Sequence, residues 1–347
     1  MSRVEQKHRA DDAQALQSVI EKFQNTPVLV VGDIFIDHYI WGKVSRISPE
    51  APVVVVNVTT EDRRLGGAGN VARNLVTLGA KVHMCGVIGD DDAGKMLVQM
   101  LETVGADVEG MMVDRTRSTI VKTRVIAHSQ QVVRIDHEVL KPLGANYAQG
   151  LSAALKSKFQ AVKGIIVSDY GKGTICPDVI DPIQKELGSG VLGVANTPVL
   201  IDPKAPNFSL YRGASIIKPN RAEASEASGI AIADRATAVQ AARVLAERWG
   251  SEMVLITLGE QGMVLVAAGD KDSPVVEVDT VAQDVFDVSG AGDTVSAVFL
   301  LALAVGATPE QAAVLSNCAA GIVVAEVGTV AVTTAQLRER VEQLFGK

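Results

Sequence analysis

The stretch Lys81–Val104, KVHMCGVIGDDDAGKMLVQMLETV, contains the two patterns that decide the fold of this chain. Its residues up to Ile88 are mostly apolar, as is typical of a strand that is buried on both faces of a sheet. After an acidic turn, Ala93–Val104 carries apolar residues at helical spacing, which predicts an amphipathic helix. A buried strand followed by a helix is the repeating unit of a parallel α/β sheet.

The same alternation recurs along the chain. Further apolar runs, each ended by Gly, Asp, Pro or Asn, are PVLVVGD (27–33), GIIVSDY (164–170), PVLIDPK (198–204), SIIKPN (215–220) and EMVLITLG (252–259). Amphipathic stretches lie between them at 70–78, 147–159, 177–187 and 235–249. We therefore predict an α/β fold, a doubly wound and mostly parallel sheet flanked by helices, with its ligands beyond the carboxyl ends of the strands.

Two stretches depart from this rhythm. Pro52–Thr60 and Ser118–Ile135 are rich in β-branched residues and carry polar residues at strand spacing. They predict antiparallel strands of a small separate sheet, a lid inserted at about 38–64 and 111–137. We expect residues 1–347 to form a single domain with this lid.

The composition excludes several classes of function. A net charge of −7 argues against a nucleic-acid binder, which needs a basic face for phosphates. The cysteines lie far apart, so they predict neither disulfides nor a zinc site. The N-terminal residues lack the apolar core of a secretory signal, and the apolar runs fall short of the roughly 18 residues of a membrane span. We expect a cytoplasmic protein with no membrane role.

One glycine motif is a decoy. Gly89–Lys95, GDDDAGK, satisfies the start of a phosphate-binding P-loop, but Met96 stands where that loop needs Ser or Thr. Three aspartates would also face the phosphate. We interpret them as the acidic start of the following helix.

The stretch DVSGAGDT (287–294) precedes an apolar run and suggests an anion site. A helix that begins near Gly290 leaves its first amides unpaired, and Gly290, Ala291 and Gly292 would let an anion approach them. Asp293 could then accept the proton of an attacking hydroxyl. The alternative is a tight turn whose carboxylate only serves the helix dipole.

Three further segments are ambiguous on their own. The glycine cluster RRLGGAGNVARNL (63–75) is either a loop that turns into a helix at Asn70 or a site where backbone amides approach a polyhydroxylated ligand closely. Asn220 and Glu223, at i and i+3, suit either a hydrated Mg²⁺ beside phosphates or a capping box. TLGEQG (257–262) could be a simple hairpin.

Taken in order, these segments resemble the PfkB or ribokinase family of carbohydrate kinases. The resemblance rests on GGAGNVARNL (66–75), the N-x-x-E element at 220–223 and DVSGAGDTVSAVF (287–299). It implies a ribokinase-like fold, ATP and Mg²⁺ as cofactors with a monovalent cation such as K⁺ as an option, and a homodimer formed through the lid. It also implies a kinase domain alone, because the nucleotidyltransferase element H-x-G-H of bifunctional relatives is missing.

The resemblance implies a role for each matching residue. Asp293 would be the base, and the backbone of Gly290, Ala291 and Gly292 the anion hole. Asn220 and Glu223 would hold magnesium through water. The remaining assignments are ATP at Thr257, Gly259, Gly262 and Asn317, and sugar at Asp33, Asp37, Gly66, Gly67, Asn70 and Lys172.

Within the family, three stretches resemble the branch that phosphorylates the anomeric hydroxyl of D-glycero-D-manno-heptose 7-phosphate for ADP-heptose and the lipopolysaccharide inner core. They are VVGDIFIDHYIWGKVSRISPEAPVVVV (30–56), VSDYGKG (167–173) and LIDPK (200–204). The second phosphate of this substrate requires additional cations, which Arg suits well. The lid segments offer Arg46, Arg63, Arg64, Lys122, Arg124 and Arg134, of which we name Arg134 as a substrate ligand and expect most others to solubilise the sheet.

Two other functions stay open. A PfkB-family kinase of another sugar or a nucleoside would share all the ATP-side residues. A sugar-responsive binding protein without turnover would not need a base at Asp293.

Overall fold

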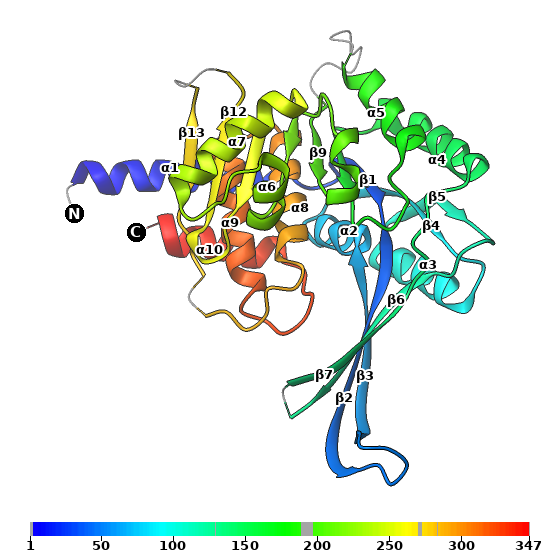
Figure 1. The fold of residues 1–347 in the computed structure, drawn as a ribbon. Helices are drawn as coiled ribbons and strands as arrows, with labels where there is room; N and C mark the ends of the chain where they lie inside the picture. The colour runs from blue at the N-terminus through cyan, green and yellow to red at the C-terminus, as the bar shows by residue number, and fades with distance from the viewer. Residues whose placement is uncertain (1–2, 129, 189–196, 270–272, 283, 347) are drawn as a thin grey trace.

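A computed structural model describes residues 3–128, 130–188, 197–269, 273–282 and 284–346. In these ranges the body of the molecule is built on a nine-stranded sheet (Figure 1). Its strands in spatial order are β13 (Val275–Val278), β12 (Met263–Ala267), β11 (Met253–Thr257), β10 (Ile216–Ile217), β9 (Val199–Asp202), β8 (Gly164–Ser168), β1 (Pro27–Gly32), β4 (Lys81–Ile88) and β5 (Asp107–Val113). Neighbours pair in parallel from β5 to β11, and β12 and β13 are antiparallel. The predicted doubly wound, mostly parallel sheet is confirmed.

Helices cover both faces of this sheet. One face carries α1 (Arg3–Glu21), α2 (Ala68–Thr77), α3 (Asp92–Val104), α8 (Ala291–Ala304), α9 (Pro309–Val323) and α10 (Thr334–Phe345). The other carries α4 (Ala145–Lys158), α5 (Pro177–Gly188), α6 (Arg221–Ser228) and α7 (Arg235–Trp249). Short 3₁₀ turns are η1 (Phe159–Ala161), η2 (Ala205–Leu210) and η3 (Gly259–Gln261). Within the described ranges, every helix is too short or too polar to cross a lipid bilayer.

The central strand β1 shows why such strands read as continuous apolar runs. Its side chains alternate between the two faces, so Val28 and Val30 join the core beneath α2 and α8. Leu29 and Val31 join the core beneath α4 and α5. Residues on both faces of β1 are therefore apolar, and the strand shows no alternation of polar and apolar residues in the sequence.

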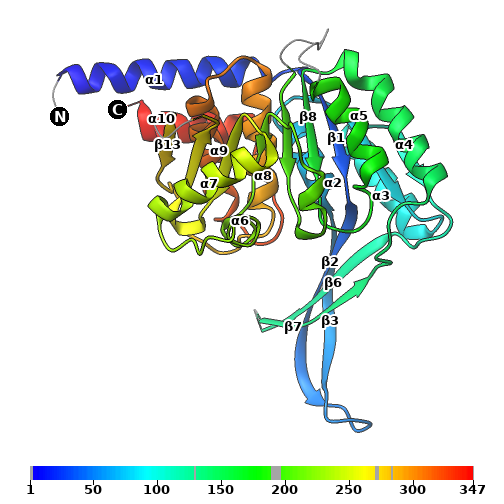
Figure 2. The same cartoon turned by 45° about the horizontal axis from the view of Figure 1, so that its top comes forward.

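A second sheet, which we call the lid sheet, projects from the body (Figures 1 and 2). Its strands in spatial order are β3 (Val54–Gly67), β2 (Ile34–Ile47), β6 (Ile120–Ala127) and β7 (Gln130–His137). The β2–β3 and β6–β7 pairs are antiparallel, as expected, but β2 and β6 pair in parallel. The expectation of an antiparallel sheet is wrong for this pair, because β2 and β6 both run outward from the body.

The lid boundaries also differ from the expected ones. β2 begins at Ile34, directly after β1, so the chain leaves the body earlier than residue 38. The second insertion begins at Ile120 and not at 111, because Met111 and Met112 lie in β5 and pair with β4 of the body sheet. The acidic decoy behaves as interpreted, since Asp91 caps α3 by accepting the Gly94 N–H at 2.8 Å.

Candidate active site

The predicted catalytic residues meet at the carboxyl ends of β8, β9 and β10, where α8 begins. A hollow of about 570 Å³ opens there. Its wall includes Tyr170, Asp202, Lys218, Asn220, Glu223, Thr257, Gly259, Gly290, Gly292 and Asp293. The position agrees with the rule that parallel α/β sheets bind ligands beyond the carboxyl ends of their strands.

Asp293 lies in the first turn of α8 and is almost fully buried. Its Oδ2 accepts a hydrogen bond from Asn70 Nδ2 at 2.8 Å, and its Oδ1 accepts one from the Tyr170 hydroxyl at 2.7 Å. Burial raises the pKa of the Asp293 carboxyl to about 7, although both hydrogen bonds act to lower it. A carboxyl with this pKa exchanges a proton readily near neutral pH, as a general base must.

The small residues before Asp293 have separate structural reasons. Gly290 caps α8 with φ of 79°, a left-handed conformation, and a Cβ there would lie 2.7 Å from Asn70 Nδ2. Gly290 thus permits the contact between Asn70 and Asp293. A Cβ at Gly292 would meet only Lys218 Nζ within 4 Å, at 3.6 Å. The amide end of α8 is therefore open to an anion on the side where a lysine lies.

Asn220 and Glu223 adopt the capping box that their spacing allowed. The Asn220 side chain accepts from the Glu223 N–H, and Glu223 Oε2 accepts from the Asn220 N–H, both at 3.0 Å. Glu223 Oε1 lies 2.7 Å from Lys204 Nζ. Both residues also line the hollow, so the capping box and a ligand role are compatible.

These contacts limit how a metal ion could bind. The Glu223 carboxylate already has two protein partners, so the pair fits a hydrated Mg²⁺ contacted through water better than direct ligation. In the part of the chain that the structure describes, no group of three or more His, Cys, Asp or Glu side chains could hold a metal ion.

The residues predicted for ATP surround a second, more apolar hollow of about 430 Å³. It is lined by Thr257, Gly259, Gly262 and Asn317 together with Val288, Ala320 and Val324. Gly262 has φ of 78°, and a Cβ there would lie 2.0 Å from the Val278 carbonyl oxygen, so only glycine fits. The two hollows share Thr257, Gly259, Val288 and Gly292, which places them side by side.

Of the predicted sugar residues, Asp33 organises a loop. Its carboxylate accepts the N–H groups of Tyr170, Lys172 and Thr174 at 2.9, 2.8 and 3.0 Å. The loop after β8 is thereby fixed over the site. Asp33 is almost fully buried, and these backbone donors supply the hydrogen bonds that a buried carboxylate needs.

Asp37, Gly66 and Gly67 lie where the lid sheet leaves the body. Asp37 is ion-paired with Arg124, while burial raises the pKa of its carboxyl. A Cβ at Gly66 would lie within 2.6 Å of Phe35 and Asp37, and Gly67, with φ of 59°, precedes α2. Asn70 follows in α2 and donates to Asp293, so the glycine-rich segment at 66–70 is connected to the predicted base.

The predicted cations are only partly brought to the site. Lys172 Nζ lies 2.8 Å from Glu138, near the lid sheet. Arg134 pairs with Asp136 on its own strand, and its side chain is 53% exposed, so the structure does not bring it to Asp293. Arg64 pairs with Asp62 and donates to the Val327 and Thr329 carbonyls, while Arg46 is exposed and Arg63 pairs with Glu61.

Sequence reasoning assigned no role to three residues of this site: Tyr170, Asp202 and Lys218. Tyr170 donates its hydroxyl to Asp293, and Lys218 Nζ lies 3.0 Å from Asp202 Oδ2. All three stand at or just after the carboxyl ends of β8, β9 and β10. That position was the available signal, because ligands bind at this edge of a parallel sheet.

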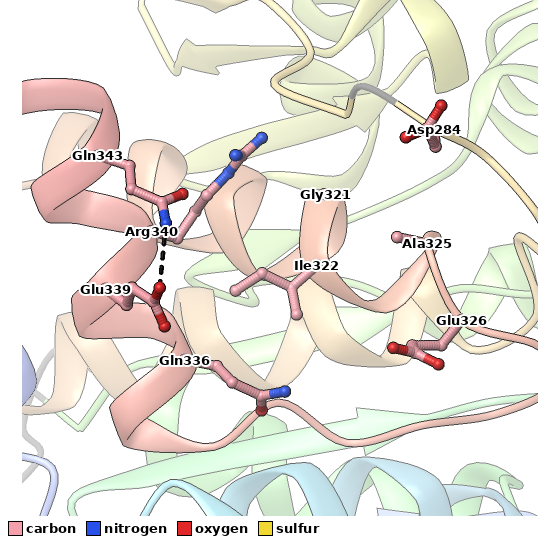
Figure 3. A pocket seen from close by; sticks show the side chains of 9 residues that line it. All are labelled: Asp284, Gly321, Ile322, Ala325, Glu326, Gln336, Glu339, Arg340 and Gln343. Atoms are coloured by element: carbon pink, nitrogen blue, oxygen red, sulfur yellow. Dashed lines mark hydrogen bonds between the residues drawn. The ribbon is translucent and has the colours of Figure 1, made fainter.

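A further hollow lies between α9 and α10, away from these residues (Figure 3). Asp284, Glu326 and Glu339 line it with Arg340, which donates to the Val281 carbonyl. Three carboxylates would repel a phosphate, so this hollow suits an anion less well than the site at α8.

Comparison with known proteins shows what the chain resembles. The family described as "pfkB family carbohydrate kinase" matches residues 25–335. The bifunctional protein HldE of Pelobacter propionicus is 44% identical over 326 residues, which cover 94% of this chain and 65% of that protein. HldE of Helicobacter pylori is 41% identical over 305 residues, or 87% of this chain and 63% of that protein. The chain thus spans somewhat less than two thirds of these relatives.

Solved structures confirm the ribokinase-like fold. Arabidopsis thaliana ribokinase complexed with ribose and ATP matches 92% of this chain and 99% of its own, with a TM-score of 0.70 and 18% identity. Phosphofructokinase-2 of Escherichia coli in complex with potassium matches 92% of this chain and 99% of its own, with a TM-score of 0.75 and 18% identity. At such identities the likeness concerns the fold alone.

Proposed function

The chain belongs to the pfkB family of carbohydrate kinases, and on that basis we propose that it transfers the γ-phosphoryl group of ATP to the anomeric hydroxyl of D-glycero-D-manno-heptose 7-phosphate. The product is the 1,7-bisphosphate, an intermediate on the way to ADP-heptose and the lipopolysaccharide inner core. The likeness of the chain to HldE proteins over most of its own length supports the choice of sugar. The observation that carries the chemistry is the buried Asp293 at the open N-terminus of α8.

Asp293 orients the acceptor hydroxyl and takes its proton. Phosphoryl transfer passes through a loose transition state, so the proton leaves late and positioning matters more than basicity. Asn70 and Tyr170 hold the two carboxylate oxygens in place. The sugar hydroxyl reaches Asp293 from the hollow that Asp293 and Tyr170 line.

The negative charge that spreads over the transferred group is met by the first amides of α8 and by Lys218. Gly290 and Gly292 leave those amides accessible, and Lys218 Nζ lies beside Gly292. Such donors are fixed before the reaction and need no reorganisation. Bound Mg²⁺ would neutralise phosphate charge, and Asn220 and Glu223 would hold it through water.

ATP occupies the two adjoining hollows in this proposal. The adenine enters the apolar hollow beside Val288, Asn317 and Ala320. Its phosphates extend past Thr257 and Gly259, the shared wall, towards Gly292. This arrangement directs the γ-phosphoryl group at Asp293.

The lid sheet supports a homodimer. Its outer strand β7 is exposed along its whole length, and Val133 and Ile135, two residues apart on one face, are 44% and 56% exposed. Neighbouring exposed apolar side chains on a projecting sheet are typical of a protein interface.

We further propose that the protein acts in the cytoplasm and that a monovalent cation such as K⁺ activates it.

A substrate panel tests the proposal. Mg-ATP is incubated in turn with heptose 7-phosphate, heptose, hexoses, hexose phosphates and nucleosides, and ADP formation is measured. We expect the highest kcat/KM with heptose 7-phosphate. Turnover of only an unphosphorylated sugar or a nucleoside would show that the chain is another kinase of the family. Sugar binding without ADP formation would favour a binding protein.

A further inference from the structure

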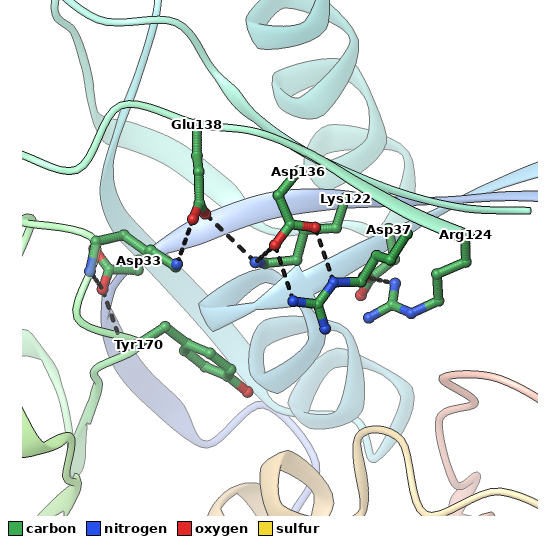
Figure 4. Close-up of polar contacts among 9 residues, drawn as sticks. Asp33, Asp37, Lys122, Arg124, Asp136, Glu138 and Tyr170 are labelled. Carbon is green, nitrogen blue, oxygen red and sulfur yellow. Dashed lines mark hydrogen bonds and ion pairs between the residues drawn. The ribbon is translucent and has the colours of Figure 1, made fainter. Parts of the chain in front are cut away.

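A carboxylate bridges two lysines where the lid sheet meets the body. Glu138, the first residue after β7, has Oε1 2.8 Å from Lys172 Nζ and Oε2 3.4 Å from Lys122 Nζ. Figure 4 shows the Glu138 carboxylate directed towards Lys122. The three side chains are 11–16% exposed, so they are partly shielded from water but within reach of a ligand.

This ion bridge is connected to the catalytic carboxyl by a short path. Tyr170 and Lys172 lie on one loop, fixed by the Asp33 carboxylate, and the Tyr170 hydroxyl contacts Asp293. Tyr170 and Lys172 are two positions apart along the chain, so their Cα atoms are at most about 7 Å apart. On the lid side, Lys122 Nζ lies 5.3 Å from the centre of the Phe35 ring, which itself lies 5.3 Å from the Tyr170 ring.

The charges of the cluster leave Glu138 as the carboxylate that the lysines share. Asp136 also lies 3.4 Å from Lys122, but Arg134 holds it more closely, with two hydrogen bonds of 3.0 and 3.1 Å. Arg134 thus neutralises Asp136. If Glu138 moved away, Lys122, Lys172 and Arg134 would face Asp136 alone, and the net charge of about +2 that remains would match a phosphate group.

Resting on the proposed function, we propose that Lys122 and Lys172 bind the remote phosphate of the sugar substrate, and that Glu138 occupies this place until the phosphate displaces it. A sugar phosphate carries its acceptor hydroxyl and its phosphate at opposite ends, as Asp293 and the lysine pair require. A sugar without the phosphate has no group that could replace Glu138. Competition with an internal carboxylate therefore contributes to selectivity against unphosphorylated sugars.

The test compares kcat/KM for heptose 7-phosphate and for the same heptose without its phosphate. Lys122→Gln and Lys172→Gln should each lower kcat/KM for the phosphorylated sugar about tenfold to hundredfold, the loss of a charged hydrogen bond, with a much smaller change for the other sugar. Glu138→Gln should lower KM for the phosphorylated sugar. Glu61→Gln, an exchange of the same type in β3, is the matched control and should leave KM unchanged.

A merely structural ion bridge would give different results. Equal losses for both sugars in the lysine variants, or a raised KM in Glu138→Gln, would overturn the proposal. Retained ATP binding and an unchanged melting temperature show that each variant is folded.

Binding of inorganic phosphate, measured by calorimetry with ATP present, separates this inference from the proposed function. We expect weak binding to the wild type, tighter binding to Glu138→Gln and none to either lysine variant. This pattern would hold even if the wild type failed to phosphorylate heptose 7-phosphate, which would refute only the proposed function. Equal phosphate binding in all four proteins would refute the lysine site.

Discussion

At the scale of single residues, Asp293 combines burial with two fixed hydrogen bonds. Asp293→Asn keeps the size of the side chain but removes the proton acceptor. We expect turnover to fall by about 10²–10⁴, the usual contribution of a general base, with ATP binding retained. Steady-state kinetics and ATP titration measure both quantities. A variant with wild-type turnover would remove Asp293 from the mechanism.

The pH dependence follows from the same carboxyl. Burial raises its pKa to about 7, so it is protonated and inactive as a base below that pH. We expect kcat/KM to rise as the pH increases through about 7 and to level off above it. An acidic limb near pH 4, the range of an ordinary aspartate, would contradict this assignment.

Tyr170 offers a sharper test of the same carboxyl. Its hydroxyl stabilises the carboxylate and lowers the pKa of Asp293. Tyr170→Phe should therefore move the acidic limb of kcat/KM to higher pH and reduce the rate near neutrality. A limb that stays in place would show that Tyr170 does not contact the catalytic carboxyl in solution.

Residue patterns predicted Asp293 but not its partner Tyr170, for a physical reason. A small-residue turn before a helix has a local signature, because the open amides need neighbouring positions without side chains. The contact between Tyr170 and Asp293 joins residues 123 positions apart, and it exists only once β8 and α8 are in place. No local pattern records such a contact.

At the scale of elements, the N-terminus of α8 depends on two glycines that act differently. Gly290→Ala should lower stability by about 1 kcal/mol or more, since φ is positive, and reduce kcat by displacing Asn70. Gly292→Ala should fold normally, because its methyl group meets only Lys218, but it should slow turnover by narrowing the path of the phosphoryl group. Thermal melts and kcat values measure the contrast.

Normal turnover in the Gly292 variants would mean that the phosphoryl group binds elsewhere. If Gly292→Ala turned over normally, and the bulkier Gly292→Val did too, the glycines would serve only the turn. The melts control for folding, since a stable but slow Gly292 variant cannot be explained by loss of structure.

Elements with a local origin were predictable, and those set by pairing were not. The apolar run at 81–88 became β4, and Asn220 with Glu223 formed a capping box, because burial on two faces and capping both leave local patterns. The parallel pairing of β2 with β6 joins strands from separate insertions. It depends on the direction in which each chain leaves the body.

At the scale of the whole molecule, the projecting lid sheet predicts self-association. Sedimentation of the wild type should give a dimer. Val133→Glu together with Ile135→Glu should give a monomer, because two charges would be placed on one face of β7. Met96→Glu on α3, also an exposed apolar residue, is the control and should remain dimeric. A monomeric wild type would contradict the proposed dimer.

The body and the lid sheet share the continuous segment from β1 into β2, and we propose that they unfold as one unit. The α/β architecture followed from the alternation of strands and helices along the chain. The ion bridge between the lid sheet and the body could not be predicted in this way. Its members Lys122, Glu138 and Lys172 come from three separate segments of the chain.

The most direct measurement is ³¹P NMR of a mixture of the protein, Mg-ATP and heptose 7-phosphate. We predict that ADP and a new phosphate resonance, coupled to the anomeric carbon, appear in equal amounts while the 7-phosphate resonance persists. Formation of inorganic phosphate without a sugar product, or no consumption of ATP, would contradict transfer to the anomeric hydroxyl.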